Sequence, residues 1–129
     1  MDALALAPME DLEMERESTD ETETLLVFTT LPDREAALKL ARGLVERRLA
    51  ACVNILSGCT SVYRWKGALE EASEIPILMK TRGARYPELE AAIRELHPYE
   101  LPEIIAVPAV RGLPDYLEWI AEETAIPIG

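Results

Sequence analysis

The chain has 129 residues, of which 49% are hydrophobic, and it carries a formal net charge of −11. This length corresponds to one domain, and this hydrophobic share excludes a chain that is disordered throughout. No apolar run reaches the roughly 20 residues that a transmembrane helix needs, and the first residues lack the positive region of a secretory signal. We therefore expect a cytoplasmic globular protein without a membrane partner.

The negative charge is concentrated at the N-terminus. Residues 1–24 contain nine of the 24 acidic residues but one of the 13 basic residues, so residues 25–129 are close to neutral. A segment this rich in Glu, Ser and Thr, without aromatic side chains, buries too little surface to fold by itself. We predict a disordered acidic leader over residues 1–24 and a folded domain over residues 25–129. Neither part carries the basic patch typical of nucleic-acid binding, so nucleic acid is not an expected partner.

The folded part begins with a strand and an amphipathic helix. Residues 25–30 form a short apolar and β-branched run, which predicts a buried strand. Asp33 is suited to cap a helix that starts at Arg34 and ends near Arg48, because its carboxylate accepts from free N–H groups of the first turn. Apolar residues recur along this helix at intervals of three and four and predict its buried face: Ala37, Leu40, Ala41, Leu44, Val45 and Leu49.

A long hairpin follows. Residues 51–56 and 59–65 predict strand on either side of a bend at Ser57-Gly58, and Lys66-Gly67 predicts a two-residue turn. The return strand then spans residues 68–81.

Two further expectations concern this return strand. Its acidic residues near the turn, Glu70, Glu71 and Glu74, are expected to face Arg64 and Lys66 across the hairpin. Pro76 has no N–H to donate to a neighbouring strand. The return strand is therefore expected to be an edge strand or to be bulged at that residue.

The last third of the chain predicts a helix, a strand and a final helix. Residues 84–96 predict a helix with Leu89, Ile93 and Leu96 on its buried stripe. Residues 103–110 predict a strand. A terminal helix starts at Pro114, and its large apolar residues are expected to be buried: Tyr116, Leu117, Trp119 and Ile120.

This order of elements predicts an α+β fold. A β-α-β-β-α-β order with right-handed crossovers gives the ferredoxin-like arrangement, an antiparallel sheet with two helices on one face, here with a short C-terminal helix added. The other face of the sheet has no helices, and the hairpin is too long for a two-helix body. Tyr63 and Trp65 on the projecting strand would be exposed in a monomer, so we expect self-association.

The segment His97-Pro98-Tyr99-Glu100-Leu101-Pro102-Glu103 holds the only histidine of the chain and two carboxylates. Each proline fixes its own φ and disfavours the α region for the residue before it. The segment is therefore stiff and extended. It is either a binding site or only a connection in which prolines end a helix. Glu100 and Glu103 have no nucleophile or oxyanion donor beside them, so we do not expect an enzyme.

Four motifs together resemble the CutA divalent-cation tolerance proteins. They are Leu49-Ala50-Ala51-Cys52-Val53-Asn54-Ile55, Ser61-Val62-Tyr63-Arg64-Trp65-Lys66-Gly67, His97-Pro98-Tyr99-Glu100-Leu101-Pro102-Glu103-Ile104 and Tyr116-Leu117-Glu118-Trp119-Ile120. They stand in family order and spacing between Leu25 and Glu123. The resemblance implies a ferredoxin-like fold, a homotrimer related in architecture to the PII signalling proteins, copper as the bound ion, and tolerance to divalent metals.

The resemblance also implies a metal site, which this chain carries only in part. In the bacterial pattern, copper is held by a cysteine near the end of the first strand and by two consecutive histidines. Here those positions are Thr29, Leu96 and His97, so one ligand of three remains. Imidazole and carboxylate suit Cu²⁺, and the expectation is weak Cu²⁺ binding through His97.

Three functions therefore remain open. The first is a non-enzymatic protein of metal binding and metal response. The second is a trimeric small-ligand sensor with clefts between subunits, lined by His97 and by Tyr63, Trp65, Lys80, Tyr99, Glu100 and Glu103. The third is a scaffold whose trimer displays the acidic leader to partners.

Overall fold

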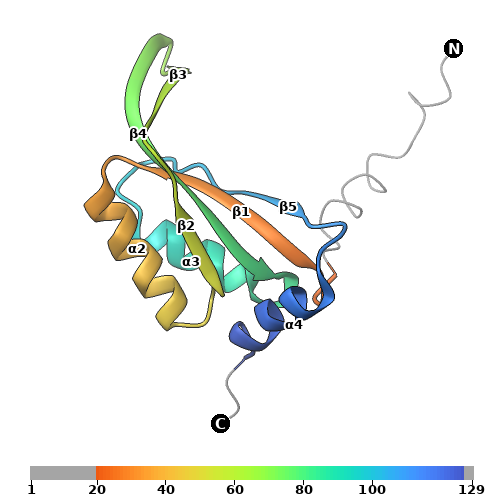
Figure 1. The fold of residues 1–129 in the computed structure, drawn as a ribbon. Helices are drawn as coiled ribbons and strands as arrows, with labels where there is room; N and C mark the ends of the chain where they lie inside the picture. The colour runs from red at the N-terminus through yellow and green to blue at the C-terminus, as the bar shows by residue number, and fades with distance from the viewer. Residues whose placement is uncertain (1–19, 127–129) are drawn as a thin grey trace, which may run out of the picture.

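The structure is a computed structural model, and it describes residues 20–126. Residues 1–19 of the predicted leader lie outside this range. Figure 1 shows the elements, which follow one another along the chain as β1 Thr24–Leu31, α2 Arg34–Glu46, β2 Cys52–Ile55, β3 Cys59–Trp65, β4 Ala68–Arg82, a 3₁₀ turn Gly83–Arg85, α3 Tyr86–Leu96, β5 Ile105–Pro108 and α4 Pro114–Glu123.

The strands form one antiparallel sheet in the order β2-β4-β1-β5, and β3 pairs with the part of β4 nearer the turn. Helices α2 and α3 lie on one face of this sheet (Figure 1). This is the strand order of the ferredoxin-like arrangement, so the α+β fold predicted from the sequence is confirmed. Among residues 20–126, no helix is long and apolar enough to cross a membrane.

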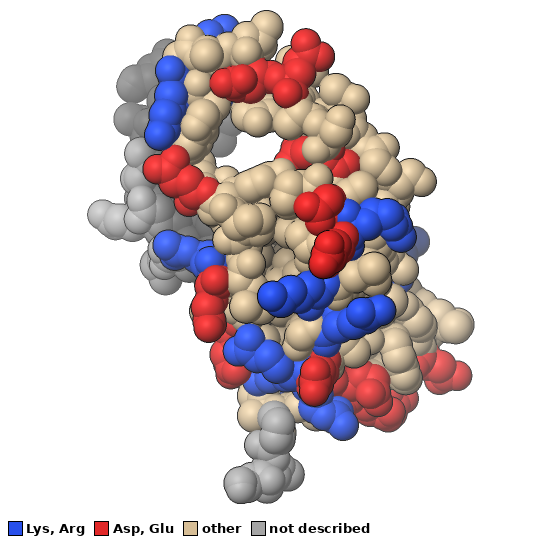
Figure 2. Space-filling view, turned by 90° about the vertical axis from the view of Figure 1, so that its left-hand side faces the viewer, with Lys and Arg blue, Asp and Glu red and all other residues tan. Residues whose placement is uncertain are grey.

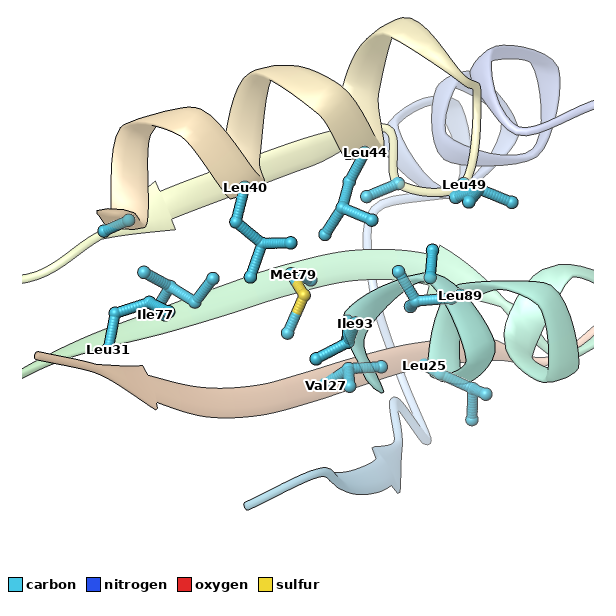
Figure 3. Packing of buried hydrophobic residues seen from close by; sticks show 13 residues of the cluster. Leu25, Val27, Leu31, Leu40, Leu44, Leu49, Ile77, Met79, Leu89 and Ile93 are labelled. Carbon is cyan, nitrogen blue, oxygen red and sulfur yellow. The ribbon is translucent and has the colours of Figure 1, made fainter. Parts of the chain in front are cut away.

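The core lies between the two helices and one face of the sheet (Figure 3). Alternate residues of β1 and β4 point into it, because successive side chains of a strand face opposite ways. The helices contribute residues spaced by three and four. The side chains with almost no exposed surface include Val27, Leu31, Leu44, Leu49, Ile77, Met79, Leu89 and Ile93.

The helices follow their predicted stripes with one exception each. Asp33 caps α2 as predicted, and its carboxylate accepts from the Ala36 N–H at 2.8 Å. The prediction that Val45 and Leu96 are buried is wrong, since they are 41% and 46% exposed. Both lie in the last turn of a helix, where the stripe has rotated away from the sheet. In α3 the buried stripe is Leu89, Ala92 and Ile93.

The strands β3 and β4 form a curled ribbon that projects beyond the body (Figure 1). Its turn is at Lys66-Gly67, where both residues have positive φ, 48° and 82°. Such a turn matches the right-handed twist of the two strands. Pro76 is not in an edge strand, because β4 lies between β1 and β2. Instead, the strands that face β4 are interrupted next to Pro76, between Ile55 at the end of β2 and Cys59 at the start of β3. Of the two predicted possibilities, the bulge is therefore the one that the structure has.

The predicted pairing of charges across the ribbon is wrong. Register places Arg64 opposite Leu69, and it places Glu70 and Glu74 opposite Tyr63 and Cys59. The turn comprises two residues, and this fixes the register of everything beyond it. As a result Glu74 lies at the base of the ribbon, next to the body.

The C-terminal elements are shorter or more exposed than predicted. Strand β5 covers Ile105–Pro108 rather than residues 103–110, because Pro102 and Pro108 limit pairing on either side. In α4, Ile120 is buried, but Tyr116 and Trp119 are 39% and 40% exposed and Leu117 is half-buried. The prediction that all four are buried is therefore wrong for a single chain. Helix α4 packs across the end of the sheet face that α2 and α3 leave free.

The residues just before β1 are joined to the body. The N–H groups of Gly83 and Ala84 donate to the carbonyl oxygens of Glu23 and Glu21 at 2.8 and 2.9 Å. Asp20 accepts from both the N–H and the hydroxyl of Thr22. The chain thus enters the fold beside the 3₁₀ turn, at the end of the sheet opposite the ribbon.

Candidate functional site

His97 lies at the C-terminal end of α3, against the end of β1. Its side chain is buried, with 7% exposed. Nε2 is 2.7 Å from the carbonyl oxygen of Thr30, and the N–H of Tyr99 donates to Nδ1 at 3.2 Å. Because Nδ1 accepts a hydrogen bond, the proton of the neutral ring is on Nε2, which donates to Thr30. Both ring nitrogens are therefore engaged.

This arrangement has a structural reason in the sheet. Alternate residues of β1 point their N–H and C=O groups toward β5, and pairing extends from Leu25–Pro108 to Phe28–Ile105. β5 begins at Ile105, so Thr30 has no strand partner on that side. The imidazole supplies the missing donor. His97 therefore satisfies a strand carbonyl that β5 does not reach.

A second set of hydrogen bonds joins the same loop to the base of the ribbon. The hydroxyl of Tyr99 donates to Glu74 Oε2 at 2.7 Å, and the hydroxyl of Thr30 donates to the same oxygen at 3.0 Å. The rings of Tyr99 and His97 have centroids 4.8 Å apart. Together His97, Thr30, Glu74 and Tyr99 form a cluster, here called the ribbon-base cluster, that ties β1, β4 and the loop after α3 to one another.

The electrostatics of the cluster keep His97 neutral and Glu74 ionised. Burial lowers the pKa of His97 below its usual 6.5, although the Thr30 carbonyl and the charge of Glu74 oppose this shift. For Glu74, burial raises the pKa, but hydrogen bonds from Ser61, Tyr99 and Thr30 outweigh it and leave the pKa below its usual value. Burial and the Glu74 carboxylate raise the pKa of Tyr99. At neutral pH the cluster therefore holds one negative charge.

The residues present do not fit the copper site that the family pattern implies. A metal ion at His97 needs a free ring nitrogen, and both are hydrogen-bonded. Thr29 is buried in the core with its hydroxyl unpartnered, and Leu96 has no ligand atom. Among residues 20–126, no group of three or more His, Cys, Asp or Glu side chains is placed to hold a metal ion. The described part of one chain thus contains no ready-made metal site.

Four of the predicted cleft residues lie on the ribbon and on the loop that it approaches. Tyr63 and Trp65 share the face of β3 that also carries Ser61, and Tyr99 belongs to the ribbon-base cluster. At the tip of the ribbon, Lys66 Nζ pairs with Glu100 Oε2 at 3.3 Å. Figure 2 shows an opening through the upper part of the molecule, where the ribbon lies in Figure 1. Ribbon and loop thus surround a space within one chain.

The other two predicted cleft residues lie apart from this opening. Lys80 is on the part of β4 next to α4, and its Nζ donates to the Tyr116 hydroxyl at 3.2 Å. Glu103 is exposed just before β5. One chain does not test whether a neighbouring subunit brings these two residues to the others, so the cleft between subunits stays a prediction.

Two members of the ribbon-base cluster were not predicted from the sequence. Glu74 was assigned to a charge pair across the ribbon, and Thr30 was only part of a strand. The available signal was the ribbon register: counting back from the turn at Lys66-Gly67 places Glu74 opposite Cys59, at the base of the ribbon.

Glu74 also lines an open hollow of about 320 Å³ at the base of the ribbon, together with Pro32, Gly58, Cys59, Thr60, Ser73 and Ile75.

Comparison with known proteins places the chain in a family. Residues 25–123 match the family described as CutA1 divalent ion tolerance protein. The divalent-cation tolerance protein CutA of Thermus thermophilus is 46% identical over 99 residues, which cover 77% of this chain and 96% of that protein. Protein CutA of Mus musculus is 45% identical over 97 residues, which cover 75% of this chain and 55% of the mouse protein.

Solved structures agree with this assignment. The divalent cation tolerance protein from Thermus thermophilus superposes with a TM-score of 0.77 at 45% identity, covering 79% of this chain and 99% of that chain. CutA1 from a psychrotrophic Shewanella species gives a TM-score of 0.78 at 40% identity, covering 81% of this chain and 97% of that chain. The resemblance read from four motifs is confirmed, and the chain belongs to the CutA1 divalent ion tolerance protein family.

Proposed function

We propose that this protein is a non-enzymatic homotrimer with a role in tolerance to divalent metal ions, and that it acts in the cytoplasm. Its relatives carry the name divalent-cation tolerance protein, which supports a role in metal tolerance. No enzyme class is attached to the family name. Glu100 and Glu103, the carboxylates considered for acid-base chemistry, are both exposed, and Glu100 pairs with Lys66.

The uncovered face of the sheet is the observation that best supports a trimer. Its middle is apolar, with Leu26, Phe28 and Leu78 half-buried and with Ile105 and Val107 55% and 39% exposed. The register places these side chains side by side across β4, β1 and β5. A contiguous apolar face of this kind is rare on a monomer and is typical of an interface. Packing against further copies is the arrangement that the resemblance implies.

For copper, we propose weak binding. Either nitrogen of His97 has to give up a hydrogen bond before it can bind Cu²⁺, and each such bond contributes about 1 kcal/mol to the folded state. Tight Cu²⁺ binding would also need ligands from a second copy, because the described residues of one chain hold no cluster. The role in tolerance then does not depend on a preformed copper centre at His97.

Three measurements test this function. Multi-angle light scattering at micromolar concentration should give three times the 14.4 kDa of one chain, and Phe28→Glu should lower that mass, whereas the matched helix-surface change Val45→Glu should not. Calorimetric titration with Cu²⁺ should show weak binding. Cells that lack their own CutA protein should grow better in excess Cu²⁺ when they express this chain. A monomeric mass would contradict the assembly, and unchanged growth would contradict the role in tolerance.

A further inference from the structure

A second cluster of polar and aromatic groups lies at the other end of the sheet from the ribbon. Tyr116 and Trp119 of α4 stack with ring centroids 5.6 Å apart and an interplanar angle of 25°. Each ring is about 40% exposed. The ammonium of Lys80 lies 5.4 Å from the Tyr116 ring centroid and 3.2 Å from its hydroxyl. We call Lys80, Arg82, Tyr116 and Trp119 the α4 corner.

The cations of this corner are not neutralised by nearby carboxylates. Lys80 and Arg82 are two residues apart on one strand, so they project from the same face at a spacing of about 7 Å. Among residues 20–126, no carboxylate oxygen lies within 4 Å of a charged nitrogen of either side chain. In addition, Nε of Arg82 is buried and has no hydrogen-bond acceptor in that part of the chain.

The ammonium of Lys80 has three N–H groups, and the Tyr116 hydroxyl takes one of them. Beside these donors, the exposed surface of the Tyr116–Trp119 stack offers a flat apolar area on which a planar ring can lie. Donors for an anion and a platform for a ring thus occupy the same place.

From this juxtaposition we propose that the α4 corner binds a small molecule that joins a planar aromatic ring to an anionic group. The ring stacks on Trp119, and the anionic group accepts from Lys80 and Arg82. This site lies outside the ribbon-base cluster and uses none of its residues. It therefore does not depend on the metal role, and a negative copper titration leaves it unaffected.

Indole N–H signals in nitrogen-15 correlation spectra of the assembled, full-length protein test this site. The chain has two tryptophans, so Trp119 is the reporter and Trp65 in the ribbon is the internal control. The probes are adenosine monophosphate and indole-3-acetate, which share the ring-plus-anion chemistry but come from different metabolite classes. Adenosine and inorganic phosphate supply the two halves separately. We expect both complete probes to shift the Trp119 signal at lower concentrations than either half, without moving the Trp65 signal.

Lys80→Gln should weaken binding of both probes by about tenfold or more, since it removes a charged hydrogen bond. Lys39→Gln, which removes the same charge from the exposed side of α2, should leave affinity unchanged. Three outcomes would overturn the proposal: a Trp119 signal that neither probe moves, phosphate binding as tightly as adenosine monophosphate, or equal affinity in the two lysine variants. A Trp119 ring covered by a neighbouring subunit would give the first of these.

Discussion

Replacing His97 separates a structural role from a role as metal ligand. His97→Ala removes the donor to the Thr30 carbonyl and the acceptor of the Tyr99 N–H. Each neutral hydrogen bond contributes about 1 kcal/mol, and loss of a buried ring adds about 1 kcal/mol or more. We expect the free energy of unfolding to fall by about 3 kcal/mol.

Two further variants divide this loss between the two hydrogen bonds. His97→Gln can keep a donor near the position of Nε2, and His97→Asn can keep an acceptor near the position of Nδ1. Each should therefore cost less than His97→Ala, about 1–2 kcal/mol. The exposed neighbour Glu95 supplies the control, since Glu95→Ala should change stability by less than about 0.5 kcal/mol.

Urea unfolding followed by circular dichroism measures these differences. All variants have to be compared at one protein concentration, because self-association makes apparent stability concentration-dependent. The reasoning is refuted if His97→Ala is as stable as Glu95→Ala. A variant that keeps its stability but loses Cu²⁺ affinity would instead identify His97 as a ligand.

The burial of His97 also predicts that the free energy of unfolding depends on pH. The pKa of His97 is lower in the folded protein than its usual 6.5, so the unfolded chain binds more protons between the two values. Stability from this group is therefore fully present above about pH 6.5 and is lost as pH falls through the folded pKa. Glu74 acts in the same direction but only below its usual 4.5. The stability gap between wild type and His97→Gln should accordingly shrink between about pH 7.5 and about pH 5.

Further substitutions test other parts of the structure. Tyr99→Phe removes a hydrogen bond to the Glu74 carboxylate and should lower the free energy of unfolding by about 1–2 kcal/mol. Acid unfolding should begin at a higher pH, because the pKa of Glu74 rises when a donor is lost. An unchanged acid midpoint would contradict this. Ile93→Ala empties a fully buried position and should cost about 3 kcal/mol in urea unfolding, whereas Val45→Ala on the exposed side of α2 should cost less than about 1 kcal/mol. Asp33→Ala removes the N-cap of α2 and should lower the thermal midpoint by an amount equivalent to about 1 kcal/mol.

Much of the fold follows from local patterns in the sequence. Asp33, the apolar stripe of α2 apart from Val45, and the turn at Lys66-Gly67 each depend on neighbours within a few residues, and the structure has them as predicted. The exposure of Tyr116 and Trp119 could not be predicted in this way. It depends on how far α4 reaches over the sheet, which is a property of the whole fold.

The site was predicted only in part. The stiff segment after α3 was recognised because its prolines and its single histidine stand together in the sequence. Its partners were missed, because Thr30 and Glu74 are 67 and 25 residues away from the groups that they bind. The role of His97 depends on where β5 starts, and the sequence pattern placed that strand two residues too early.

The central claim is that His97 is a neutral residue whose two nitrogens hold β1 and the following loop together. Because the chain has one histidine, long-range nitrogen-15 spectra of the imidazole report on it alone. We predict a proton on Nε2 and a pKa below the usual 6.5. A proton on Nδ1 or an ordinary pKa would contradict the claim.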